Sequence, residues 1–303
     1  MSNNSVLLIG AANLDICGSP VSDFRLHDSN IGKISVSFGG VGRNIAHNLR
    51  LLGIDVSMIT AFGNDMFASL LKNDVSSLGI DTSMSVFSQT LPSSVYMYIT
   101  DSTGDMHTAI NDMDVVSSVT PEHLEKHLDR IRDFSTVVID TNLSAETIRY
   151  LAEISEKYAL KIYADGVSAA KAEKLRGLLE HIFCLKLNRL EAEILTGESS
   201  PEAAVKELLR LGVKRPFVSS GKGGMITFDG QQLLCVPAQE TICVNATGAG
   251  DAATAALVYA GLHGFSLKDS AELAVKAGTA TVQTKEAVYP ALAESLFPSA
   301  TKK

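Results

Sequence analysis

The sequence of 303 residues lacks several features that would assign it to a particular class of protein. No stretch approaches the roughly 18 consecutive apolar residues of a membrane-spanning helix, and no Lys or Arg occurs in the first five residues. Lys and Arg number 26 against 34 Asp and Glu, a net charge of −8, and no basic cluster interrupts that balance. We therefore expect a cytoplasmic protein that binds neither nucleic acid nor membranes, with a small molecule as its ligand.

Cysteine is also scarce, and no two of the four cysteines form a Cys-x-x-Cys pair. The four are Cys17, Cys184, Cys235 and Cys243. Each lies among apolar neighbours, which predicts reduced, buried thiols and argues against disulfides or a zinc site. His123 and His127 lie four apart on an expected helix, but the segment offers no further ligand, so we interpret them as part of a solvent-facing helix surface.

Short runs rich in β-branched residues alternate with helical patterns along the chain. Strands are expected at 6–9, 56–59, 136–140, 160–163, 182–185 and 216–219. Helices are expected at 44–52, 66–78, 145–158, 203–211, 249–262 and 267–283. This alternation predicts the α/β class, with a doubly wound, mostly parallel sheet.

Two stretches, 16–38 and 83–112, interrupt this alternation. Apolar side chains alternate with tyrosines at 95–99, and a hairpin turn is expected at 101–105. We expect these stretches to form one small β-sheet lid, inserted in a single domain of residues 1–303. The apolar face of the lid would either pair two subunits into a homodimer or close on the chain's own site.

The strongest motif is Asn-Ala-Thr-Gly-Ala-Gly-Asp at 245–251, which leads into a helix of small residues. The backbone N–H groups of Ala249, Gly250 and Asp251 can bind an anion, as helix N-termini do. Asp251 could accept the proton of an attacking hydroxyl group in phosphoryl transfer. Taken alone, the motif is equally consistent with an aspartate that merely complements the helix dipole.

A second glycine cluster occupies 37–44, and Asn13-Leu-Asp15 follows the first strand. Asp15 and Asn44 could hold vicinal hydroxyl groups at the carboxyl ends of the strands. Turn and capping chemistry explains the glycines and Asn44 equally well. A dinucleotide fingerprint is excluded, because Ile45 fills its third glycine position.

Two further motifs follow later strands. Asn188-Arg-Leu-Glu191 opens a helix and is, in isolation, best explained as a capping box. The Gly-rich segment 219–224 could pass backbone N–H groups along the phosphates of a nucleotide, or form an ordinary hairpin. A P-loop is excluded, because the sequence contains no G-x-x-x-x-G-K-[ST].

In this combination and order, the motifs resemble the PfkB, or ribokinase-like, family of carbohydrate and nucleoside kinases over residues 4–290. The resemblance implies an α/β domain with a β lid, ATP as co-substrate and Mg²⁺. It implies a catalytic set of Asp251 as general base with Gly248, Ala249 and Gly250 as anion hole. It implies a substrate-binding set of Asn13, Asp15, Gly39, Gly40 and Asn44. It implies an ATP-binding set of Asn188, Ser220, Gly221, Gly224 and Thr247, with Glu191 reaching Mg²⁺ through water.

Segments 28–34, 39–46 and 109–113 carry a closer resemblance within the family, which implies transfer of the ATP γ-phosphoryl group to the 5′-hydroxyl of free pseudouridine. The base of pseudouridine has a free ring N–H, which Asn111, with Lys33 or Asp112, could recognise. Asn111 is equally explained as a turn residue at a strand end.

Other acceptors remain open, namely ribose, fructose, adenosine or inosine, as does a non-catalytic nucleoside-binding protein. Asn245 stands where most of the family has Asp, so no requirement for a monovalent cation is carried over.

Overall fold

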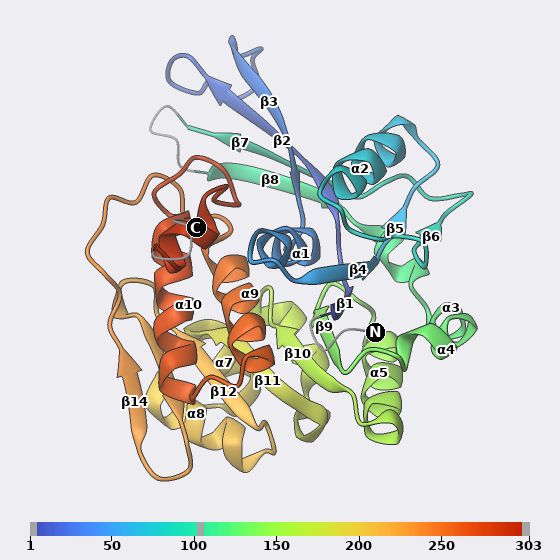
Figure 1. Cartoon of the computed structure of the whole chain (residues 1–303). Helices are drawn as coiled ribbons and strands as arrows, with labels where there is room; N and C mark the ends of the chain where they lie inside the picture. The colour runs from blue at the N-terminus through green and yellow to red at the C-terminus, as the bar shows by residue number, and fades with distance from the viewer. Residues whose placement is uncertain (1–4, 102–105, 299–303) are drawn as a thin grey trace.

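The computed structural model describes residues 5–101 and 106–298, in which a central eight-stranded sheet runs in the order β14-β13-β12-β11-β10-β9-β1-β4 (Figure 1). These strands are β1 (Ser5–Ile9), β4 (Asp55–Ile59), β9 (Thr136–Asp140), β10 (Lys161–Asp165), β11 (Ile182–Asn188), β12 (Arg215–Ser219), β13 (Met225–Phe228) and β14 (Leu233–Val236). The six strands from β4 to β12 are parallel, and the β13-β14 hairpin is antiparallel. The carboxyl ends of the six parallel strands therefore meet at one edge, where ligands bind in sheets of this kind.

Helices cover both faces of this sheet. One face packs against α1 (Val41–Leu51), α9 (Ala249–Leu262), α10 (Leu267–Thr281) and α11 (Leu292–Leu296). The other packs against α5 (Ala145–Tyr158), α7 (Arg189–Thr196) and α8 (Pro201–Arg210). Within β1, Val6 and Leu8 lie on the face covered by α9, and Leu7 and Ile9 lie on the face covered by α5. A strand buried on both faces is continuously apolar, which is why β1 contains no polar alternation.

A second, four-stranded sheet lies at the top of Figure 1, beyond α1, in the order β3-β2-β7-β8. Its strands are β2 (Asn13–Pro20), β3 (Gly32–Gly39), β7 (Val95–Thr100) and β8 (Met106–Asp112). The remaining elements are β5 (Ala61–Phe62), β6 (Val86–Phe87), α2 (Met66–Ser77), α3 (Pro121–Lys126), α4 (Leu128–Ile131), α6 (Ala169–Ala172) and 3₁₀ turns at Asp114–Ser118, Glu173–Leu175, Leu179–His181 and Gly221–Gly223. We call the four-stranded sheet the lid sheet.

The expected α/β class, with a mostly parallel sheet and an additional small sheet, is confirmed. All six expected strands and all six expected helices are present, and α5 and α9 have the expected ends. The β13-β14 hairpin was not predicted as strands. Segments 16–38 and 83–112 supply most of the lid sheet, and β7 pairs with β8 in antiparallel fashion. Most of the hairpin turn expected at 101–105 lies outside the described residues.

The cysteine prediction is half wrong. Cys184 is buried and Cys17 partly so, but Cys235 and Cys243 are exposed. Cys235 lies on β14, which is the edge strand of the sheet, and Cys243 lies in the irregular segment before α9. An edge strand has one open flank, so apolar neighbours in the sequence did not guarantee burial there.

The histidines at α3 are not purely a solvated surface, since His123 Nε2 lies 2.7 Å from the main-chain oxygen of Met84. Across residues 5–101 and 106–298, no group of three or more His, Cys, Asp or Glu side chains is arranged to hold a metal ion. No helix in these same ranges is both long enough and apolar enough to span a membrane.

Candidate active site

Helix α9 begins at the glycine-rich turn of the 245–251 motif. Its N-cap, Gly248, has a φ of 82°, in the left-handed region that favours glycine. A Cβ atom at Gly248 would also lie 1.8 Å from the main-chain oxygen of Ala287, so no other residue fits there. The first N–H groups of the helix point out of this turn without carbonyl partners inside the helix. The N–H group of Ala249 is directed at the main-chain oxygen of Ala246 at 3.4 Å, and an anion at this turn would meet the N–H groups of Gly250 and Asp251.

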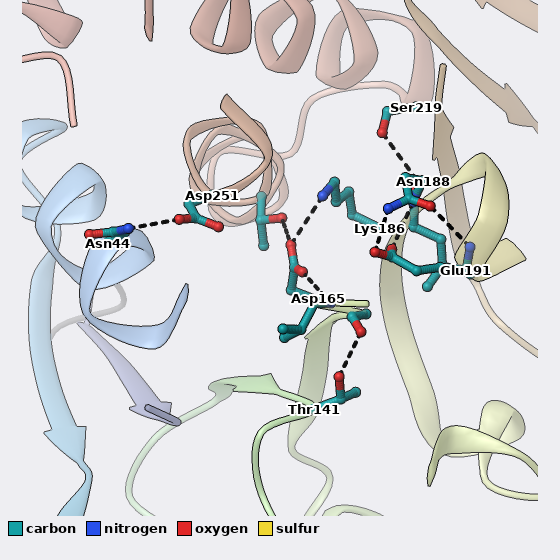
Figure 2. A network of polar contacts seen from close by, with 12 residues as sticks. Asn44, Thr141, Asp165, Lys186, Asn188, Glu191, Ser219 and Asp251 are labelled. Carbon is teal, nitrogen blue, oxygen red and sulfur yellow. Dashed lines mark hydrogen bonds and ion pairs between the residues drawn. The ribbon is translucent and has the colours of Figure 1, made fainter. Parts of the chain in front are cut away.

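Asp251 lies in the first turn of α9 and is 9% exposed. Its Oδ2 accepts a hydrogen bond of 2.9 Å from Asn44 Nδ2 on α1 (Figure 2). Burial and the nearby Asp165 raise the pKa of Asp251 to about 7, against the opposing effect of Asn44. A carboxyl group with a pKa near neutrality suits a general base that operates at neutral pH.

The predicted sugar-binding residues gather where β2 of the lid sheet begins and where β3 leads into α1. Asn13 Nδ2 donates a hydrogen bond to Asp15 Oδ1, and a Cβ atom at Gly39 would lie 2.1 Å from Asp15 Oδ2. Burial raises the pKa of Asp15 to about 6, although Asn13 and Arg43 oppose this rise. Because Gly39 has no side chain, the Asp15 carboxylate can lie close to the backbone just before α1, whose N-cap is Gly40.

Arg43 is a site residue that the sequence did not reveal. Its guanidinium group forms a two-point ion pair with Asp74 of α2, with distances of 2.9 and 3.0 Å. Arg43 Nη1 also donates to Asn44 Oδ1 at 3.3 Å. Because the amide oxygen of Asn44 is held by a donor, its Nδ2 is left to face Asp251. The chain of contacts from Asp74 to Asp251 fixes which way the Asn44 amide points.

A group of buried polar side chains lies beneath α9, at the carboxyl ends of β9, β10 and β11 (Figure 2). Asp165 Oδ2 accepts a hydrogen bond of 2.6 Å from Thr254 Oγ1 and lies 3.4 Å from Lys186 Nζ. Asp140 Oδ2 accepts from the main-chain N–H of Ala11 at 2.9 Å. Asp140 ends β9 and Asp165 ends β10, which was the one signal in the sequence that could have identified them, whereas Lys186 lies two residues before the end of β11.

Asn188 and Glu191 form the capping box that the sequence suggested. Glu191 N donates to Asn188 Oδ1 at 3.0 Å, and Asn188 N donates to Glu191 Oε2 at 2.8 Å. Glu191 Oε1 accepts from Asn188 Nδ2, and the Glu191 residue is 1% exposed. Since both carboxylate oxygens hold the helix start, Glu191 is not arranged as a direct metal ligand.

The loop proposed to border ATP lies beside this capping box. Asn188 on β11 pairs with Ser219 on β12, and the turn from Ser220 to Gly224 begins at the residue after Ser219. Ser220 N donates to the Gly224 main-chain oxygen at 2.9 Å, which closes the turn around Gly221. Ser220 Oγ is buried and has no hydrogen-bond partner within the part of the chain that the structure describes.

Thr247 lies in the other loop at this edge of the sheet, before α9. Its N–H donates to Asn245 Oδ1 at 2.9 Å, and Asn245 Nδ2 donates to the Lys285 main-chain oxygen at 2.8 Å. Asn245 therefore holds the turn before α9 to the segment that follows α10.

The strand registers of the lid sheet place the three candidates for base recognition differently. Asp15, Tyr96 and Asn111 form one row across β2, β7 and β8, so their side chains share a face. Lys33 lies on this face four residues from the end of the row, at about 13 Å along β3. Asp112 pairs with Val95, so its side chain belongs to the opposite face of the lid sheet, which favours Lys33 over Asp112 as the partner of Asn111. Tyr96, which the sequence did not single out, lies between Asp15 and Asn111.

Comparison with known proteins agrees with this arrangement. The model of the pfkB family carbohydrate kinases matches residues 3–294. The chain is 34% identical over 276 residues to the pseudouridine kinase of Escherichia coli (strain K12), covering 89% of this chain and 87% of that protein. It is 35% identical over 277 residues to the uncharacterized sugar kinase YeiI of the same strain, covering 89% and 75%.

The fold superposes on that of the ribokinase from Arabidopsis thaliana complexed with ribose and ATP, with a TM-score of 0.84 at 21% identity, covering 97% of this chain and 98% of that one. The fold is therefore ribokinase-like. With the family model spanning nearly the whole sequence and a relative above 30% identity, the chain belongs to the pfkB family of carbohydrate kinases.

Proposed function

We propose that this pfkB-family kinase transfers the γ-phosphoryl group of ATP to the 5′-hydroxyl group of free pseudouridine. The observation that carries the phosphoryl-transfer part is the placement of Asp251: a buried carboxyl group with a pKa near 7, in the first turn of an anion-binding helix. The choice of acceptor is supported by the likeness to the E. coli pseudouridine kinase.

In the proposed reaction, Asp251 accepts the proton of the 5′-hydroxyl group as O5′ forms a bond to the γ-phosphorus. The bond between that phosphorus and the β–γ bridging oxygen breaks, and ADP leaves. The hydrogen bond from Asn44 keeps one carboxylate oxygen in place, so the other faces the hydroxyl group. The proton taken by Asp251 is then released to water.

The negative charge on the transferred group is balanced by the N–H groups at the start of α9, which need no rearrangement during the reaction. The residues present fit a Mg²⁺ ion that arrives with ATP, because such an ion keeps several waters and needs few protein oxygens. Glu191 and Asn188 would hold it through water, since the Glu191 oxygens already serve the capping box. When bound, Mg²⁺ supplies further charge neutralisation on the phosphates.

The lid sheet supplies the acceptor side of the proposal. Asp15 would accept hydrogen bonds from the ribose hydroxyl groups, as a carboxylate flanked by Asn13 and Gly39 is able to do. Further along the same row, Tyr96 offers an aromatic face and Asn111 an amide. An amide can accept a hydrogen bond from the ring N–H that pseudouridine has and uridine lacks. Closure of this face over the site would exclude water as a competing acceptor.

The test is a panel of purified nucleosides and sugars with ATP and Mg²⁺, with ADP formation as readout. We expect pseudouridine to give the highest kcat/KM, and replacing Asn111 with Leu to lower that value while leaving turnover of ribose, if any, unchanged. Equal or better turnover of uridine, ribose, fructose, adenosine or inosine would overturn the choice of pseudouridine. Calorimetric binding of a nucleoside without any turnover would overturn the proposal of a kinase reaction.

The opposite face of the lid sheet supports the proposal of a homodimer. Ile34, Val36, Met97 and Ile110 share this face and are 78, 57, 44 and 66% exposed. A soluble monomer seldom leaves such a contiguous apolar face open to water. Because Asp15 and Asn111 face the other way, the exposed face can pair with a second copy without blocking the proposed acceptor site.

A further inference from the structure

Lys186 is a buried cation in the candidate active site, and it has no role in the proposed reaction as described so far. It lies near the carboxyl end of β11, two residues before Asn188, with a side chain that is 9% exposed. Its ammonium group lies 3.4 Å from Asp165 Oδ2 (Figure 2). Burying a charge is costly unless it is paired and fully hydrogen-bonded, so a lysine at this depth needs a reason.

The ammonium group lies directly against the first turn of α9. A Cβ atom at Gly250 would be 2.8 Å from Lys186 Nζ, so the absence of a side chain there is what admits the lysine. The N-terminus of a helix carries partial positive charge, and a cation placed beside it is repelled. Two positive groups are thus directed at one place, an arrangement that is favourable when an anion binds between them.

The carboxylates around Lys186 keep it charged. Burial alone would lower the pKa of Lys186, but Asp165, Glu191 and Asp251 together outweigh that effect and raise it. The direction of this shift agrees with the geometry, in which the ammonium group is paired with Asp165.

Other lysines at this edge of the sheet are engaged by protein oxygens. Lys171 donates to the side chain of Asn142 at 2.5 Å, and Lys174 donates to the main-chain oxygens of Thr141 and Leu143 at 3.0 and 2.8 Å. Among the residues that the structure describes, Asp165 is the one hydrogen-bond acceptor of Lys186. An ammonium group has three N–H donors, so two remain for a ligand.

We propose that Lys186 is a further catalytic residue, whose ammonium group donates hydrogen bonds to the non-bridging oxygens of the γ-phosphoryl group and stabilises its charge during transfer. Asp165, held by Thr254, is then the positioning residue that aims the ammonium group at the first turn of α9. Lys186 keeps its proton throughout, because the proton of the acceptor goes to Asp251. The inference rests on the phosphoryl-transfer part of the proposed function and not on the identity of the acceptor.

Nucleotide affinity tests the contact without any acceptor. The non-hydrolysable ATP analogue AMP-PNP and ADP are titrated, with Mg²⁺, into the wild type and Lys186→Met by calorimetry. We expect Lys186→Met to weaken AMP-PNP binding by about tenfold or more while ADP binding changes little, since only AMP-PNP carries a γ-phosphoryl group. Lys161→Met, at the amino end of β10, is the matched control and should leave both affinities unchanged.

A double variant separates catalysis from structural pairing. Lys186→Met leaves Asp165 as an unpaired buried charge and should lower Tm, and Asp165→Asn/Lys186→Met removes both charges and should restore it. If Lys186 acts on the phosphoryl group, kcat of the double variant stays reduced by about 100-fold or more despite its recovered stability. If the lysine served only to neutralise Asp165, activity would return together with stability.

The outcomes keep this inference apart from the proposed function. Recovered activity in the double variant, or equal loss of AMP-PNP and ADP affinity in Lys186→Met, overturns the assignment of Lys186 and leaves the kinase reaction intact. A wild type that prefers another acceptor overturns the choice of pseudouridine, and the kinetic test then proceeds with that acceptor. A wild type that binds neither nucleotide overturns both.

Discussion

At the scale of single residues, the site depends on carboxyl groups held in surroundings that do not favour their charge. Asp251 and Asp15 both have raised pKa values, about 7 and about 6, because burial outweighs the hydrogen bonds that each accepts. The pKa of Asp140 is raised as well, mainly because this side chain is fully buried. A cluster of this kind is expensive for the fold and is characteristic of functional sites.

The pH dependence of turnover tests Asp251 as base. A base with a pKa of about 7 is protonated and inactive in acid, so kcat/KM should fall about tenfold per pH unit below pH 7 and reach a plateau above it. Asp251→Asn should lower kcat by about 10²–10⁴-fold. Initial rates between pH 5 and 9 provide the measurement.

Asp269→Asn is the control, because Asp269 also lies in the first turn of a helix, α10, but is exposed and outside the site. It should retain the wild-type profile. Near-normal turnover by Asp251→Asn would remove Asp251 from the role of base.

The same residue should limit stability at high pH. A raised carboxyl pKa means that the folded state holds its proton more tightly than the unfolded state, whose aspartate titrates near 3.8. Folding stability from this group is therefore complete below about pH 4 and is lost as the pH rises towards 7. Asp251→Asn, which cannot ionise, should have a higher Tm than the wild type at pH 8.

Thermal unfolding at pH 8 and at pH 4 measures this difference, which should shrink or vanish at the lower pH. An Asp251→Asn protein that is less stable than the wild type at pH 8 would contradict the raised pKa. The expected trade of stability for activity at one residue is the pattern seen where strain serves function.

At the scale of elements, the sequence predicted best where one local cause determines an element. Ser144 accepts from Thr147 N at the start of α5, and Gly248 begins α9, so a local cap or turn fixes each start where the apolar spacing had placed it. The central parallel strands were equally readable, because burial on both faces makes them continuous apolar runs. The β13-β14 hairpin was missed, since it is short, antiparallel and half open to solvent.

The lid sheet shows what local sequence could not supply. Its alternating pattern revealed strands, but the parallel pairing of β2 with β7 joins segments about 80 residues apart. Such a pairing is set by how the chain packs, and it decides which side chains share a face. This pairing places Tyr96 beside Asp15, and the pairing of β7 with β8 places Asn111 on the same face and Asp112 on the opposite one.

The exposed face of the lid sheet leads to a prediction about assembly. Val36→Glu places a charge at the β3 end of the apolar row that continues to Met97 and Ile110, and a charge buried at an interface without a partner is strongly unfavourable. The wild type should sediment at twice the chain mass of 32.2 kDa, and Val36→Glu at that mass.

Ile194→Glu on α7 is the matched control, since Ile194 is also exposed, at 45%, but lies away from the lid sheet. It should sediment as the wild type does. A monomeric wild type would mean that this face has another use.

At the scale of the whole molecule, the site draws on segments spread from β2 to α9, and this limits what sequence alone could assign. Motifs with a local signature, such as 245–251 and the capping box at Asn188, were found because glycine, a cap and a carboxylate occur within a few residues. Arg43 and Lys186 were missed because their partners, Asp74 and Asp165, are distant in the sequence. Only the folded chain brings those charges together.

The net charge of −8 leads to the last prediction, which concerns the size of the acceptor. Anion binding is proposed to rest on the backbone of α9, a few loop N–H groups and one buried lysine, and the sequence contains no basic cluster of the kind that holds a polymer of phosphates. In an RNA chain, moreover, the 5′-oxygen of an internal pseudouridine is already esterified. An oligonucleotide containing pseudouridine should therefore yield no ADP and should not inhibit turnover of the free nucleoside. The same oligonucleotide digested to nucleosides should restore ADP formation, which controls for the amount of pseudouridine added. ADP formation from the intact strand, beyond any contribution of a free 5′ end, would show that the acceptor site is open to polymers.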